Sequence, residues 1–407
     1  MLDLSTIRAQ FPILARRVYG RRLVYLDNAA TTQKPQSVLN RILEYYTAFN
    51  SNIHRGVHFL SEQASGLYEM GRTTVQQFIH AASDSEIIFT HGTTDAINLL
   101  AGSFGDAFVA EGDEIIVTEM EHHSNLVPWQ NLCLRQGARL KILSFNDDGG
   151  LALDQLQALI SPKTKLLSLT YVSNVLGQIN PVGEIIGLAH ARGVPVLIDG
   201  AQAIAHLPVD VQDLDCDFFA FSGHKMYAET GIGVLYGKHR WLEKMPPYQS
   251  GGGMIGSVDQ EVSTYAEAPH KFEAGTPHIA GVVGLAAAIG YIQEIGRARI
   301  ADHEADLLRH AVDQLANVDG VTLYGRSTLR CGAVSFNLAD LHPYDVGAIL
   351  DKMGIAVRTG AMCAQPVMRH YGIEGTLRAS VAVYNTRAEI DQLIVGLNKA
   401  RQLLEKH

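Results

Sequence analysis

Two stretches decide the fold, 194–203 (VPVLIDGAQA) and 218–225 (FFAFSGHK). Each begins as a short, almost continuous apolar run and ends in polar residues beside a glycine, which is the pattern of a strand buried on both faces. Asp199 ends the first strand and Ser222 the second, with Lys225 three residues further on. In open α/β sheets ligands bind beyond the carboxyl ends of the strands, so these three residues are the first candidates for a site.

The same alternation of apolar strands and longer amphipathic segments extends through the first two thirds of the chain. Strands alternating with helices predict an α/β protein with a mainly parallel seven-stranded sheet covered on both faces. The expected strands span 86–90, 114–118, 140–145, 166–171, 194–199, 218–222 and 233–236. Helices are expected at 96–110, 125–136, 154–160 and 182–192.

The pattern changes after residue 245. Residues 245–276, rich in Pro and Gly, predict a long irregular segment, and loops of this length are usually functional. One long helix is expected from 279 to 317, followed by a second, smaller α/β unit. Its expected strands lie at 321–324, 332–337 and 355–358, and its closing helix at 387–405. We predict a large domain over 25–290 and a small domain formed by 1–24 and 291–407.

Composition limits the classes of function. The chain has 407 residues, 47% of them hydrophobic, and a charge of 33 − 42 = −9, which argues against nonspecific binding to nucleic acid or anionic lipid. No apolar run approaches the roughly 18 residues of a membrane span, and no signal sequence is evident, so a soluble cytoplasmic protein is expected. The four cysteines include no Cys-x-x-Cys pair, and four thiols in a chain of this length do not predict a disulfide framework. The spacing of the histidines does not match a metal-ligand motif, so no metal site is expected.

Asp199 and Lys225, at neighbouring strand ends, match the needs of pyridoxal 5'-phosphate (PLP). Lysine forms a Schiff base with this cofactor, and an acid keeps the pyridine nitrogen protonated. Asp199 could instead be only a helix N-cap. The segment 91–96 (HGTTDA) opens a helix after a strand and suits a phosphate, and His122 after another strand could lie flat on an aromatic cofactor. Taken alone, the segment 91–96 also fits an ordinary capped helix start, and His122 also fits a buried core histidine.

Taken in order, the motifs resemble a known family, the fold-type I PLP enzymes of the cysteine desulfurase class within the class V aminotransferases. The nearest resemblance is to the group II desulfurases that serve the SUF system of iron–sulfur cluster assembly, a group that overlaps selenocysteine lyases. The motifs are YLDNAATTQKP (25–35), NIHRGVH (52–58), GTT (92–94), EHHSN (121–125), DGAQ (199–202), SGHK (222–225), FEAGTP (272–277), RTGAMCAQP (358–366) and LRASVAVYNT (377–386).

The resemblance implies roles around the cofactor. Lys225 would bond to PLP, Asp199 would pair with the pyridine nitrogen, Gln202 would contact the phenolic oxygen, and His122 would stack on the ring and take part in catalysis. The expected phosphate ligands are Thr93, Thr94, Ser222 and His224. The resemblance also places Thr276 against the phosphate of a partner subunit, which implies a homodimer with shared sites.

For the substrate, the resemblance implies that Arg378, Asn174 and Arg358 bind L-cysteine, with Arg378 taking the carboxylate, a task that suits a planar guanidinium. Cys363 lies in a loop bounded by glycine and proline, where an accessible thiol is expected, and the resemblance makes it the sulfur acceptor. L-Alanine would be the product. A SufE-like protein would then collect the persulfide sulfur.

Two places depart from the family pattern. Met362 stands before the active cysteine where histidine is common, and Ala228-Glu229 replaces the usual Gly-Pro after the lysine. Two other readings stay open. One is another PLP enzyme of the same fold, such as a selenocysteine lyase or a cysteine sulfinate desulfinase, and some of these reactions do not need the Cys363 thiol. The other, which the two departures motivate, is a PLP-binding assembly scaffold with weak activity.

Overall fold

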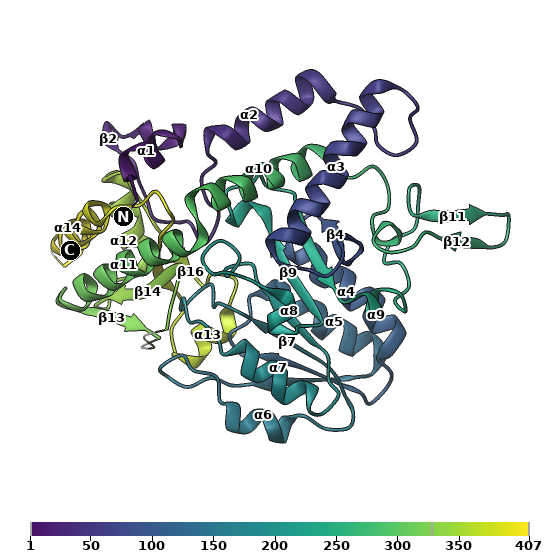
Figure 1. Ribbon diagram of the computed structural model, residues 1–407. Helices are drawn as coiled ribbons and strands as arrows, with labels where there is room; N and C mark the ends of the chain where they lie inside the picture. Colours follow the sequence, from purple (N-terminus) through teal and green to yellow (C-terminus); the bar gives the residue numbers. More distant parts are fainter. Residues whose placement is uncertain (1, 326, 328, 406–407) are drawn as a thin grey trace.

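A seven-stranded sheet forms the centre of the molecule in the computed structural model, which describes residues 2–325, 327 and 329–405 (Figure 1). Its strand order is β4-β10-β9-β8-β7-β5-β6. The strands from β9 to β6 are parallel, and β10 is antiparallel to both of its neighbours. The bounds are β4 Ile87–Thr90, β5 Glu114–Thr118, β6 Arg139–Leu143, β7 Thr164–Thr170, β8 Val196–Asp199, β9 Phe218–Ser222 and β10 Gly233–Gly237. All seven expected strands are confirmed within two residues.

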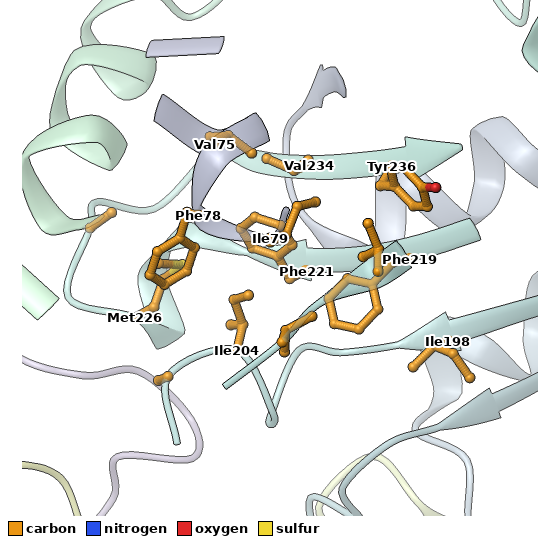
Figure 2. Close-up of a cluster of buried hydrophobic side chains, with 14 of the residues drawn as sticks. Val75, Phe78, Ile79, Ile198, Ile204, Phe219, Phe221, Met226, Val234 and Tyr236 are labelled. Atoms are coloured by element: carbon orange, nitrogen blue, oxygen red, sulfur yellow. The ribbon is translucent and has the colours of Figure 1, made fainter. Parts of the chain in front are cut away.

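The sheet is covered on both faces because its strands are apolar on both sides. Along β9, Phe218 belongs to one buried cluster and Phe219 to the other, since successive side chains point to opposite faces. Figure 2 shows Val234 of β10 beside Val75 of α3, with Phe219, Phe221 and Tyr236 in the same buried cluster. The helices over this face are α3 (Phe59–Phe78), α7 (Val182–His190) and α10 (Ile279–Ile295); those over the other are α4 (Thr93–Phe108) and α5 (Val127–Gln136).

The C-terminal part forms a second, smaller α/β layer with a four-stranded antiparallel sheet of order β13-β14-β17-β16. Its bounds are β13 Val321–Tyr324, β14 Ala333–Leu338, β16 Arg358–Gly360 and β17 Thr376–Ser380, and its helices are α11 (Arg297–Ala316), α12 (Pro343–Lys352) and α14 (Arg387–Leu404). These helices and strands enclose a separate buried cluster. A short parallel pair, β3 (Val24–Tyr25) with β15 (Ile355–Ala356), joins the N-terminal segment to this layer.

The remaining elements are short. They are α1 Leu4–Ala9, β1 Arg17–Val18, β2 Arg21–Arg22, α2 Gln36–Glu44, α6 Leu153–Leu159, α8 Val211–Leu214, α9 His239–Leu242 and α13 Gln365–His370, with single turns at Pro12–Ala15, Tyr45–Phe49, Asp84–Glu86, His123–Asn125, Gly223–Lys225 and His270–Phe272. The segment expected to be irregular contains a hairpin, β11 (Ile255–Val258) with β12 (Ser263–Tyr265), which projects from the body in Figure 1.

The structure differs from the sequence expectations in several helices and strands. The expected long helix at 279–317 is two helices, α10 and α11, bent by 78° at a break between them. Gly296 occupies the break with φ 95°, a conformation outside the helical region that favours glycine. The expected strand at 355–358 is divided between β15 and β16, and helix α3 and strand β17 were not anticipated. The proposed domain division at residue 290 falls inside α10 and stays a prediction.

Within the described residues no single helix combines the length and apolarity needed to cross a membrane. Among these residues, α10 and α11 taken together have the length and composition of a membrane span, but they are bent apart, and most of α10 is buried in the protein. The same residues contain no group of three or more His, Cys, Asp or Glu side chains arranged to hold a metal ion.

Candidate active site

A cavity of about 580 Å³ lies where the carboxyl ends of the central strands meet the C-terminal layer. The strand ends supply Asp199 of β8 and Ser222 of β9, and the C-terminal layer supplies Arg378 of β17. Of the residues predicted for the site, all but Thr276 line this cavity: Thr93, Thr94, His122, Asn174, Asp199, Gln202, Ser222, His224, Lys225, Arg358, Cys363 and Arg378. The fold thus brings together residues that are up to 285 positions apart in the sequence.

Asp199 and Lys225 form an electrostatic pair on the cavity wall. One Asp199 oxygen accepts the Ala201 N–H at 2.9 Å. Burial raises the pKa of Asp199, and the Lys225 charge opposes that rise. Burial lowers the pKa of Lys225, and the Asp199 charge opposes that fall. A buried carboxylate needs a cation, and a lysine of lowered pKa can act as a nucleophile or base.

The first turn of α4 forms a cradle for an anion. Gly92 precedes it with φ 149° and, as a glycine, has no side chain to cap the helix. Ser222 Oγ accepts the Thr93 N–H at 2.8 Å and lies 2.7 Å from Thr93 Oγ1. His224 adds a buried Nδ1 with no hydrogen-bond partner among the described atoms. A helix N-terminus surrounded by hydroxyl groups suits a phosphate, so the residues present fit PLP.

His122 and Gln202 flank this region. His122 Nδ1 lies 3.1 Å from the Ser124 N–H, which can only donate, so Nδ1 is the acceptor. Burial lowers the pKa of His122 to about 3, and the ring is therefore neutral with its proton on Nε2. Gln202 Nε2 donates to Ala29 O at 2.8 Å, which fixes the orientation of its amide.

Two arginines face the other side of the cavity. Arg378, 3% exposed, donates to Asn174 O at 2.8 Å and to Asp27 Oδ1 at 3.3 Å, while its Nε has no partner among the described atoms. Burial lowers the pKa of Arg378 to about 10, and Asp27 opposes this shift. Arg358 shares Asp27 at 3.1 Å but is half-exposed. A buried guanidinium with a free donor suits a carboxylate ligand.

Cys363 is the exposed cysteine at the rim of the cavity; Cys133, Cys216 and Cys331 are buried. Its loop contacts a residue that the sequence reasoning missed, because the His123 N–H donates to Cys363 O at 2.8 Å. His123 is the second histidine of the EHHSN motif, directly after the predicted site residue His122. Its position in the motif does not indicate a contact with Cys363, which lies 240 positions away.

Thr276 lies outside this cavity. It lines a neighbouring pocket of about 290 Å³ together with Asn52, Arg55 and Gly253. Within one chain, therefore, Thr276 is not brought to the Asp199–Lys225 pair. Its predicted place against a partner's cofactor stays a prediction.

Comparison with known proteins identifies the family of the chain. The family described as aminotransferase class-V matches residues 24–393. A protein named cysteine desulfurase from Pectobacterium atrosepticum is 50% identical over 402 residues, covering 98% of both chains. Among solved structures, a cysteine desulfurase from Thermococcus onnurineus NA1 is 40% identical with a TM-score of 0.93, covering 100% of this chain and 99% of the other. One from Escherichia coli is 39% identical with a TM-score of 0.91, covering 99% of each.

These matches span nearly the whole chain, and they extend through both the central sheet and the layer that supplies Arg378 and Cys363. The chain belongs to the class-V aminotransferases, within them to the cysteine desulfurases, and is a fold-type I enzyme that uses PLP. The family resemblance inferred from the motifs is confirmed.

Proposed function

We propose that the enzyme converts L-cysteine to L-alanine and transfers the sulfur to Cys363. The observation that supports this proposal most directly is the position of the exposed Cys363 thiol on the same cavity as Lys225 and the buried Arg378. A lyase that released a leaving group into solvent would not need a thiol there. For the sulfur to reach an acceptor outside the protein, an exposed position is required.

Bound PLP supplies an electron sink that stabilises negative charge at the substrate Cα. Asp199 would keep the pyridine nitrogen protonated, Gln202 would contact the phenolic oxygen, and the first turn of α4 with Ser222 and His224 would hold the phosphate. Arg378 binds the substrate carboxylate with its free Nε–H, and Arg358 adds positive charge at the rim.

The amine of Lys225 is suited to accept the Cα proton because burial lowers its pKa. The Cys363 thiolate, the reactive form, attacks the substrate sulfur. The bond from sulfur to the substrate Cβ breaks as the bond from sulfur to Cys363 Sγ forms, leaving a persulfide, and protonation of the remaining carbon skeleton yields alanine. His122, neutral with its proton on Nε2, presents a hydrogen-bond donor to the cavity, and Lys225, once it holds the Cα proton, can return a proton to that skeleton.

We further propose a cytoplasmic homodimer in which Thr276 completes the partner's phosphate site, a SufE-like acceptor and a role in SUF-type cluster assembly. The buried free cysteines fit a reducing compartment. Thr276 supports the dimer because it lines other pockets and lies outside the Asp199–Lys225 cavity of its own chain.

The test is sulfide and alanine production from L-cysteine with excess reductant, on the PLP-loaded wild type and on Cys363→Ser. We expect both products from the wild type, and a loss of sulfide of at least about 100-fold in the variant, because serine cannot form a persulfide. Cys133→Ala, a buried thiol on α5, is the matched control and should remain active. Equal activity of wild type and Cys363→Ser would contradict the thiol role and favour a selenocysteine lyase or desulfinase.

A further inference from the structure

The loop that carries Cys363 has an unusual backbone. Met362 and Cys363 both adopt left-handed conformations, with φ 52° and 54°, although neither is glycine. Such conformations are unfavourable for L-residues and persist only where the surrounding structure holds them. Accepting the proposed role of Cys363, we propose that His123 is a positioning residue that, with Asn174, clamps this loop over the cavity.

The clamp consists of three hydrogen bonds from two separate segments. The His123 N–H donates to Cys363 O at 2.8 Å, and the Gln365 N–H donates to His123 Nε2 at 3.3 Å. On the opposite side, Asn174 Nδ2 donates to Met362 O at 2.8 Å. His123 follows β5 and Asn174 follows β7, so both ends of the left-handed turn are tied to the central sheet.

The chemistry of the His123 ring fits this role. A backbone N–H can only donate, so His123 Nε2 holds the lone pair and the proton lies on Nδ1. Burial lowers the pKa of His123, which keeps the ring in the neutral form that can accept. The adjacent histidines therefore differ: His122 has its proton on Nε2, whereas His123 presents a lone pair there.

The clamp also connects the thiol to the substrate site. The same Asn174 that donates to Met362 accepts a hydrogen bond from Arg378 Nη1 on its backbone oxygen, at 2.8 Å. A loop held in this way presents its thiol without first having to be ordered, which is how positioning lowers a barrier. Removing the His123 side chain leaves the Gln365 N–H without its acceptor, while the bond from the His123 backbone N–H to Cys363 O remains. Substrate binding by Arg378 is untouched by that change.

The experiment compares PLP-loaded wild type, His123→Ala and His123→Gln. Gln is the conservative variant, since its Oε1 can replace Nε2 as acceptor for the Gln365 N–H. His310→Ala is the matched control, because His310 bonds to Asp391 on the surface of the C-terminal layer and touches no part of the loop. Two quantities are measured: amide hydrogen exchange of the peptide 361–368 in the resting enzyme, and kcat and KM for L-cysteine.

We expect His123→Ala to speed exchange of this peptide about two- to tenfold, the effect of one neutral hydrogen bond. The kcat should fall by a similar factor with KM changed less than twofold, and His123→Gln should restore both. The inference is overturned by unchanged exchange in His123→Ala, by faster exchange with unchanged kcat, or by a Gln variant no better than Ala. Exchange is measured without substrate, so its result does not depend on the Cys363→Ser assay. If Cys363→Ser were as active as wild type, the proposed function would be refuted. The clamp would then be tested by amide exchange alone.

Discussion

The backbone of the anion cradle touches a glycine of the neighbouring strand, and this contact yields a sharp prediction. Gly233, the first residue of β10, pairs with Thr90 and with Ser222. A Cβ added to Gly233 would lie 2.4 Å from Gly92 Cα, 2.7 Å from its carbonyl carbon and 2.8 Å from its nitrogen. All three are backbone atoms, so no side-chain rotation can relieve the clash. Gly233→Ala should therefore move the residue that begins the α4 cradle.

The size of the effect follows from these distances. Non-bonded carbon atoms rest about 3.5 Å apart, so Gly92 must shift by about 1 Å. A shift of that size removes or weakens at least one charge-assisted hydrogen bond from the first turn of α4 to the phosphate, worth about 1.5–3 kcal/mol. This corresponds to PLP binding about 10- to 150-fold weaker. The overpacking itself should also lower the free energy of unfolding by about 1–3 kcal/mol.

The assay is titration of the apoenzyme with PLP, followed by the absorbance of the bound cofactor, alongside urea unfolding of the apoenzyme. Gly187→Ala is the control: it lies exposed on α7 with no atom within 4 Å of the added Cβ. That change should leave PLP affinity unaltered and raise stability by up to about 1 kcal/mol. If Gly233→Ala binds PLP within twofold of wild type, the cradle does not depend on the position of Gly92, and the reasoning is refuted.

Three further predictions concern buried charges. Arg378→Lys should lower kcat/KM for L-cysteine about 10- to 150-fold, because lysine cannot reproduce the planar array of donors; a loss below twofold in steady-state kinetics would contradict this. Arg72→Met should destabilise the fold by about 3–5 kcal/mol in urea unfolding, since Arg72 is 2% exposed and holds buried Glu273 through bonds of 2.8 and 2.9 Å; changing both residues to Met should recover much of the loss. Burial raises the pKa of Glu121 to about 8 from 4.5, so its stabilisation is complete below pH 4.5 and is lost as the pH rises through about 8. Unfolding free energies at pH 5, 7 and 9 should thus fall less steeply for Glu121→Gln than for wild type, and equal slopes would refute the shift.

The parts of the fold that could be predicted are those whose sequence signals are local. Buried strands such as 218–222 are continuous apolar runs, and their polar ends place Asp199 and Ser222 at one edge of the sheet. Strand β17 was missed because Arg378 interrupts its apolar pattern with a charge that only the cavity explains. The break at Gly296 was missed because α10 is a long apolar segment and α11 an amphipathic one, both of helix length, and one glycine inside a helical pattern is often tolerated.

The candidate residues around the cofactor could be named from motifs, but their partners could not. The clamp of His123 depends on a loop 240 positions away, and Asp27 holds Arg378 from a segment near the N-terminus. Such contacts arise from tertiary packing and leave no periodicity or spacing in the sequence. Thr276 is a different case. Its motif, FEAGTP, is clear in the sequence, but within a single chain Thr276 does not line the cavity.

The two departures from the family pattern have physical compensations in this structure. Met362, which stands where a loop histidine is common, is only 8% exposed and packs in the main apolar cluster, while its backbone oxygen is held by Asn174. Glu229 Oε1 lies 3.0 Å from His278 Nε2. Burial lowers the pKa of nearby Lys34 to about 8, and Glu229 opposes that fall, so the extra carboxylate favours the charged form of a buried lysine. Glu229 does not line the cavity, whereas Met362 lines it without the ring nitrogens that a histidine would supply, so the activity assay on L-cysteine decides the scaffold reading.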